Sequence, residues 1–226
     1  VLSVCSLSGA RNLRIADPDT LGPSNLNRLV GSVCDLGVPK TTLAYRRVVE
    51  ADPYATVETF AEGFSASTAP QFIGGGGTQR ASVILEEMDD LARKVELRRL
   101  ARAAEVPVIM VTDDGDDVIL DVERYDLDPQ RPLFHGRAGE LVDLTEDELQ
   151  NPERRVELAG RIVGDDVDER LAVALRQVGK TIPSWPQLGT AASLAGVVGA
   201  VVARKLVCGA DVPSGRCHVR VSDLVL

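Results

Sequence analysis

The chain has 226 residues, with 25 basic and 34 acidic side chains, and a formal net charge of −9 at pH 7. Hydrophobic residues make up 44% of it and aromatic residues only 4%, which suits one large domain with an aliphatic core. The acidic balance excludes a general nucleic-acid binder, because phosphate-backbone affinity requires a basic surface. The four cysteines are scattered without a Cys-x-x-Cys pair, so zinc held by four thiolates is not expected.

The first half of the chain alternates between strand-like and helix-like segments. Apolar runs that end at acids predict buried strands, and apolar residues at helical spacing predict the helices between them. This alternation predicts an α/β fold with a Rossmann-like, mainly parallel sheet flanked by helices. Strands are expected over 12–17, 55–63, 81–87 and 106–112, and helices over 39–52 and 89–105.

The pattern changes after residue 112. Segments 118–125 and 217–224 alternate between apolar and polar residues and predict antiparallel strands, with a polar helical stretch over 145–178 between them. The apolar run 188–207 is rich in glycine and alanine and is marginal in length for a membrane span, so a buried core helix is expected. With no signal peptide and with cysteines typical of reduced thiols, we expect a cytoplasmic protein without a membrane partner.

A run of four glycines at 74–77 raises the question of a phosphate-binding loop. Such a loop follows a strand and opens a helix, so that amide groups at the helix N-terminus face the anion. Here the run precedes a predicted strand, which favours a flexible surface connection.

Acidic residues follow three of the predicted strands, at Asp17, Asp89 and Asp113. Open parallel sheets bind ligands beyond the carboxyl ends of their strands, where an acid accepts hydrogen bonds from a ribose hydroxyl, a role that suits Asp17. Asp89 suits Mg²⁺, which prefers one or two carboxylates together with phosphate oxygens. Arg28 and Lys40 would supply positive charge to a polyphosphate. Each residue alone is more typical of a solvated side chain or a surface ion pair, but together they favour a nucleotide site.

The stretch ADPDTLGPSNLNRL at 16–29, followed by DLGVPK at 35–40, resembles the signature of the ThiF/MoeB family of ubiquitin-activating-enzyme-like adenylyltransferases. The family pattern is an apolar strand, Asp-x-Asp, a spacer, Ser-Asn-Leu-x-Arg, and then Gly-x-x-Lys opening a helix. VILEEMDD at 83–90 resembles the family's next strand, and LDVERYDLDPQRPLFHG at 120–136 is similar to a bacterial ThiF-type branch. The first motif maps onto Asp17, Asp19, Ser24, Asn25, Leu26, Arg28, Gly37 and Lys40.

The resemblance implies an enzyme that uses ATP and Mg²⁺ to activate the C-terminal carboxylate of a small sulfur-carrier or ubiquitin-like protein, or of a peptide. It implies that Asp17 holds the ribose, that Asn25, Arg28 and Lys40 contact the phosphates, and that Asp89 binds the metal. Arg28, Lys40 and Asp89 are therefore the catalytic candidates.

The resemblance also extends the nucleotide-binding set to Asp19, although turn formation or capping explains Asp19 and Asn27 equally well. It divides a single domain into an ATP-binding part over 1–112 and a probable carrier-binding and dimer part over 113–226. A homodimer is implied, with the small carrier protein or peptide as partner.

The sequence departs from the family pattern in two places. The Gly-x-Gly-x-x-Gly turn expected before Asp17 is absent, and residues 1–10 are either the tail of a first strand with an omitted loop or entirely helix. Residues 113–207 contain no cysteine, so adenylation without a thioester is expected, and the zinc thiolates of the sulfur-carrier activators are also missing. A non-catalytic scaffold or binding subunit is the alternative. A nicotinamide-dependent oxidoreductase would not explain Asn25, Arg28 and Lys40 together.

Overall fold

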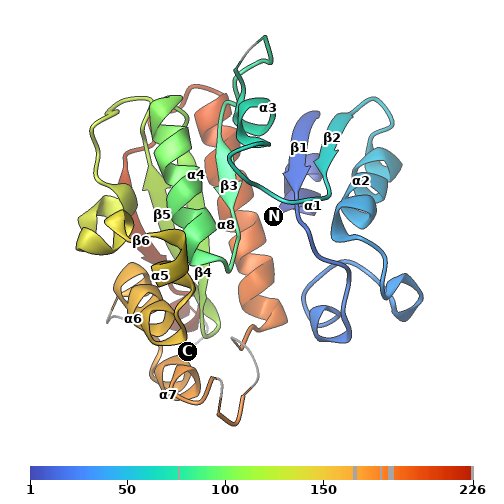
Figure 1. Ribbon diagram of the computed structural model, residues 1–226. Helices are drawn as coiled ribbons and strands as arrows, with labels where there is room; N and C mark the ends of the chain where they lie inside the picture. The colour runs from blue at the N-terminus through green and yellow to red at the C-terminus, as the bar shows by residue number, and fades with distance from the viewer. Residues whose placement is uncertain (76, 165–166, 179, 183–185, 225–226) are drawn as a thin grey trace.

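The computed structural model describes residues 1–75, 77–164, 167–178, 180–182 and 186–224 (Figure 1). It confirms an α/β fold in which strands alternate with helices in the first half. The strands are β1 (Asn12–Ala16), β2 (Thr56–Phe60), β3 (Ile84–Glu86), β4 (Val108–Asp114), β5 (Asp117–Glu123) and β6 (Gly215–Val219). The helices are α1 (Leu2–Leu7), α2 (Lys40–Ala51), α3 (Ala69–Ile73), α4 (Leu91–Ala103), α5 (Glu146–Gln150), α6 (Pro152–Val163), α7 (Glu169–Leu175) and α8 (Gly189–Val207).

The N-terminal part is a two-stranded parallel sheet with α2 as its crossover. β1 pairs with β2 from Asn12 opposite Thr56 to Ala16 opposite Phe60. Pro39 immediately precedes α2, a position at which its fixed φ and missing N–H are tolerated. Since both strands run in the same direction, the residues that follow β1 lie at the carboxyl edge of this sheet.

The second sheet has the order β3-β4-β5-β6, and Figure 1 shows α4 on one of its faces and α8 on the other. Side chains alternate between the two faces of a strand. Val108 and Met110 of β4 therefore belong to the hydrophobic cluster that includes α4, and Ile109 and Val111 belong to the cluster that includes α8. The core is thus built in two layers around β4 and β5.

The described strands form two sheets, whereas the sequence predicted one mainly parallel sheet. Parallel pairing joins β1 to β2 and β3 to β4, and β5 and β6 are added antiparallel. Before β1, residues Leu2–Leu7 form the helix α1, which packs against α2 and α8 and contributes no strand between β1 and β3. The helix covers residues 2–7 of the stretch 1–10, and a turn at residues 8–9 follows it before β1.

Local residues explain how the second half divides into helices. The predicted helical stretch 145–178 is divided into α5, α6 and α7, because Asn151 caps α6 ahead of Pro152 and Gly164 ends α6 with a φ of 92°. The run 188–207 forms α8, which packs small residues such as Ala195 and Ala203 against the sheet, although only about a third of the helix is buried. Within the described part of the chain, α8 is also the one helix that is long and apolar enough to cross a membrane.

A network of charged side chains lies inside the core. Arg98 of α4 donates through Nη1 to Glu86 Oε2 at 2.8 Å and through Nε to Glu123 Oε2 at 2.6 Å. Lys94 Nζ donates to Glu86 Oε1 at 2.7 Å, and the Tyr125 hydroxyl donates to Glu123 Oε1 at 2.6 Å. Burial acts to raise the pKa of Glu86, but the charges of Lys94 and Arg98 outweigh it and hold that pKa below its ordinary value. The network therefore ties α4 to the ends of β3 and β5.

Candidate functional site

Three of the predicted residues meet at the carboxyl end of β1. Lys40 Nζ lies 2.7 Å from Asp19 Oδ2 and 3.6 Å from Asp17 Oδ2. The backbone supports this geometry, because the Lys40 amide donates to the Asp19 carbonyl at 2.9 Å and the Asp19 amide donates to Asp17 Oδ1 at 2.9 Å. Asp17 and Lys40 are half-buried and Asp19 is exposed. An anion that approaches Lys40 would therefore compete with the more exposed of its two carboxylate partners.

Asn25 and Arg28 lie on the segment that leads away from this cluster. Asn25 Oδ1 accepts a hydrogen bond from the Gly22 amide at 2.9 Å and caps a short 3₁₀ turn, so the side-chain NH₂ is the donor that a ligand would use. Arg28 Nη1 donates to the Ser24 carbonyl at 2.7 Å and to Asn27 Oδ1 at 3.0 Å. Its guanidinium is thus held by its own loop and forms no ion pair with a carboxylate of the described residues.

Asp113 connects Arg28 and Asp89 electrostatically near the end of β4. Burial raises the pKa of Asp113, and the charge of Asp89 raises it further. A hydrogen bond with the Gln187 side chain and the charge of Arg28 act in the opposite direction. Arg28 and Asp89 therefore lie close enough to Asp113 to influence its ionisation, although they are far from it in sequence.

The residues around Asp89 fit a magnesium ion. Asp89 is exposed in the loop between β3 and α4, and Glu86 Oε1 steadies this loop by accepting a hydrogen bond from the Met88 amide at 2.7 Å. Asp113 Oδ2 is buried and has no hydrogen-bond partner among the described residues. An orphaned carboxylate oxygen near a second acid suits Mg²⁺. Because the described residues contain no cluster of three or more potential metal ligands, phosphate oxygens would have to complete the coordination.

The predicted residues thus form two groups. Asp17, Asp19 and Lys40 make up the first, and Arg28 and Asp89 join Asp113 in the second. In the ranges that the structure describes, no ion pair or hydrogen bond links the two groups, and Asn25 lies on the segment between them. That they surround a single nucleotide therefore stays a prediction.

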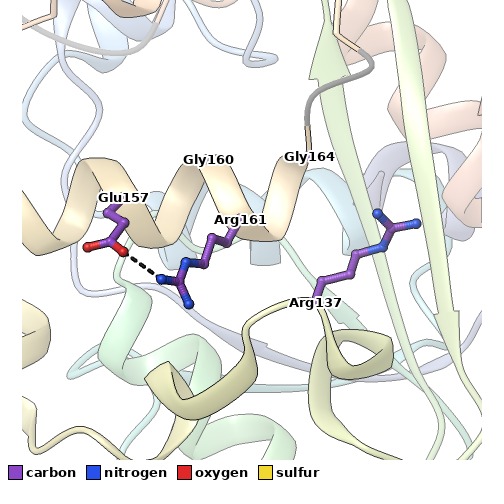
Figure 2. Close-up of a pocket in the computed structure, with 5 residues that line it drawn as sticks. All are labelled: Arg137, Glu157, Gly160, Arg161 and Gly164. Carbon is purple, nitrogen blue, oxygen red and sulfur yellow. Dashed lines mark hydrogen bonds and ion pairs between the residues drawn. The ribbon is translucent and has the colours of Figure 1, made fainter.

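A pocket elsewhere on the molecule carries arginines but none of the predicted residues. It has a volume of about 490 Å³ and lies between α6 and the loop that precedes Gly139 (Figure 2). Arg161 is paired there with Glu157 at 2.7 Å, while Arg137 extends toward Gly164. We assign this pocket no part in nucleotide binding.

Sequence reasoning left three neighbours of Arg28 and Asp89 out of the predicted site. Asp113 carried a signal, because it follows a strand as the other acids do, but it was not included among the site residues. Asn27 is explained equally well by a turn or cap, and no local pattern singles out Gln187. The contact between Asn27 and Gln187 joins residues 160 positions apart, which no local pattern reveals.

Comparison with known proteins gives matches over most of the chain. The model of the ThiF family matches residues 1–113. An uncharacterized protein of Mycobacterium tuberculosis (strain CDC 1551 / Oshkosh), MT1398, is 35% identical over 210 residues, which cover 93% of this chain and 28% of that protein. The chain therefore spans little more than a quarter of this curated relative.

Solved structures share the fold at low sequence identity. The crystal structure of PaaA has a TM-score of 0.62 at 16% identity and covers 98% of this chain and 57% of its own. Escherichia coli MccB, solved with the peptide MccA-N7isoASN, has a TM-score of 0.58 at 13% identity, with 91% and 52% covered. MccB solved with ATP has a TM-score of 0.51 at 14% identity.

These neighbours share the α/β, Rossmann-like fold, and this chain spans just over half the length of each of them. Together with the signature at 16–40, the match to the family model over half of the chain settles the assignment. The chain belongs to the ThiF family.

Proposed function

We propose that the chain is the nucleotide-binding part of an ATP- and Mg²⁺-dependent adenylyltransferase that activates the C-terminal carboxylate of a small peptide or carrier protein. The observation that carries this proposal is the gathering of Lys40 with Asp17 and Asp19 at the end of β1. Strand-end acids at the carboxyl edge of a parallel sheet are where folds of this type bind nucleotides. MccB, a neighbour in fold, was solved both with ATP and with a peptide, which supports the same ligand classes here.

The residues would divide the work of binding and catalysis. Asp17 would accept hydrogen bonds from the ribose hydroxyls, and Asn25, Arg28 and Lys40 would hold the phosphates. A carboxylate oxygen of the substrate would attack the α-phosphorus while the bond to the bridging oxygen of the β-phosphate breaks, so that an acyl-adenylate forms and pyrophosphate leaves. The protein's part in such a transfer is positioning and neutralisation of charge.

Asp89, with Asp113, would hold Mg²⁺, which supplies charge neutralisation to the phosphates when bound. Asp19 is more exposed than Asp17. It would therefore be the carboxylate that gives up its contact with Lys40 when the nucleotide binds, so that Lys40 can contact the phosphates. No thioester step is included, since residues 113–207 contain no cysteine. A cytoplasmic homodimer is part of the proposal.

The test is nucleotide binding measured by calorimetry, together with ATP–pyrophosphate exchange in the presence of candidate peptides. Lys40→Met removes a charged hydrogen-bond donor, worth about 1.5–3 kcal/mol, and is expected to weaken ATP binding on the order of 10- to 100-fold. Lys205→Met, on the exposed last turn of α8, is the matched control and should leave binding unchanged. If Lys40→Met and the control bind ATP equally, the assignment of Lys40 to the phosphates is wrong.

A second function is favoured by the separation of the predicted residues into two groups. Among the described residues no ion pair or hydrogen bond joins the group that contains Lys40 to the group that contains Arg28, which suits a ThiF-like scaffold that binds a partner without catalysing a reaction. Absence of both ATP binding and pyrophosphate exchange would favour this scaffold over the enzyme.

A further inference from the structure

We propose that Asn27 is a positioning residue that holds the Arg28 guanidinium in place by anchoring its loop to the segment before α8. This inference rests on the proposed function, because it assigns Asn27 a role in phosphate binding by Arg28. Asn27 is exposed and directly precedes Arg28, the predicted phosphate contact. The sequence alone explains Asn27 equally well as a turn or capping residue.

The Asn27 side chain bridges two parts of the chain. Its Oδ1 accepts a hydrogen bond from Arg28 Nη1 at 3.0 Å, and its Nδ2 donates to the Gln187 carbonyl at 2.8 Å. An amide is suited to this position, because it offers an acceptor on one side and a donor on the other. An aspartate of the same shape would keep the first bond and lose the second.

Close backbone packing fixes the same junction. A Cβ built on Gly189, the first residue of α8, would lie 2.5 Å from the Asn27 carbonyl oxygen, nearer than real Cβ contacts come. Glycine at position 189 therefore permits this close approach of the Asn27 backbone to the start of α8, because a side chain there would collide with it.

The anchoring segment also reaches Asp113. Gln187 accepts a hydrogen bond from Asn27 through its carbonyl, and its side chain interacts with Asp113. Gln187 thus connects the loop that carries Arg28 with Asp113. The segment before α8 is thus in direct contact with the N-terminal signature.

A double-mutant cycle on ATP affinity tests the proposal. Asn27→Ala removes one or two neutral hydrogen bonds and is expected to raise the Kd for ATP about 2- to 10-fold, and Arg28→Ala is expected to raise it on the order of 10- to 100-fold. If Asn27 acts through Arg28, adding Asn27→Ala to Arg28→Ala produces no further loss. Full additivity of the two changes would overturn the proposal, because an independent effect on the fold does not vanish when Arg28 is absent.

Two further measurements separate this proposal from the proposed function. Gly189→Ala should increase amide hydrogen exchange at residues 25–30 without any ligand, whereas Gly160→Ala, where a Cβ meets nothing within 4 Å, should not. Unchanged exchange in Gly189→Ala would contradict the anchoring. If Gly189→Ala shows the increased exchange but the wild-type chain binds no ATP, the anchoring is retained, whereas its role in phosphate binding and the proposed function are refuted.

Discussion

Replacement of Arg98 by methionine tests whether the buried charged network sets the stability of the second sheet. Arg98 is fully buried, and it donates to Glu86, to Glu123 and to the Lys94 carbonyl, the last at 3.2 Å. Its guanidinium also lies 4.0 Å from the centre of the Phe134 ring. Methionine keeps most of the aliphatic stem but leaves two buried carboxylates without their shared cation. Removal of one partner of a buried ion pair costs about 3–5 kcal/mol, which is a large share of the 5–15 kcal/mol typical of a domain.

The assay is urea unfolding followed by circular dichroism. At the usual slope of about 1–3 kcal/mol per molar urea, the loss lowers the midpoint by at least about 1 M. Arg154→Met, which breaks an exposed ion pair on α6, should leave the midpoint unchanged. The triple variant Glu86→Gln, Arg98→Met, Glu123→Gln should recover most of the loss, because the uncompensated charges are gone. A loss of the same size in the neutralised background would refute the electrostatic explanation.

Two other predictions concern the ionisation of Glu86 and the backbone at Gly74. The pKa of Glu86 is lowered in the folded state, so its contribution to stability is present above its unfolded pKa of about 4.3 and is lost as pH falls through the folded value. The difference in unfolding free energy between the wild type and Glu86→Gln should therefore narrow from pH 6 to pH 3, and a constant difference would show that the carboxylate is not stabilised. Gly74→Ala places a Cβ 2.4 Å from the Arg80 backbone, at a residue with a φ of 108°, and should lower the free energy of unfolding by more than about 1 kcal/mol. Gly160→Ala, where a Cβ meets nothing within 4 Å, should be neutral or stabilising. Equal melting temperatures for the two variants would contradict this prediction.

Local patterns in the sequence predicted most of the secondary structure. Apolar runs located β1, β4 and α8, because burial on both faces of a strand or on one side of a helix leaves a periodic signal. The strand-end acids Asp17 and Asp19 and the helix-opening Lys40 were also predicted, and they meet in the structure. These successes concern residues whose role depends on their position within one element.

The remaining features depend on contacts between distant segments. The division into two sheets depends on which strands pair, and the alternation of strands and helices is the same for one sheet or two. Arg98 lies in a helix that was predicted from apolar residues at helical spacing, and only its contacts with Glu86 and Glu123, from two different strands, explain its burial. The proximity of Asn27 to Gln187 likewise requires the complete fold.

The separation of β1 and β2 from the larger sheet has a consequence for how the molecule opens. Most residues of β1 and β2 are only half-buried, with Phe60 the one fully buried member, whereas nearly all of β4 and β5 is buried. Fluctuations that open the smaller sheet break fewer apolar contacts, so it should melt first and exchange its amides faster. The Asp-x-Asp segment therefore lies on the less stable of the two sheets. A bound nucleotide that contacted both sheets would slow amide exchange in β1 and β2 and leave exchange in the larger sheet unchanged.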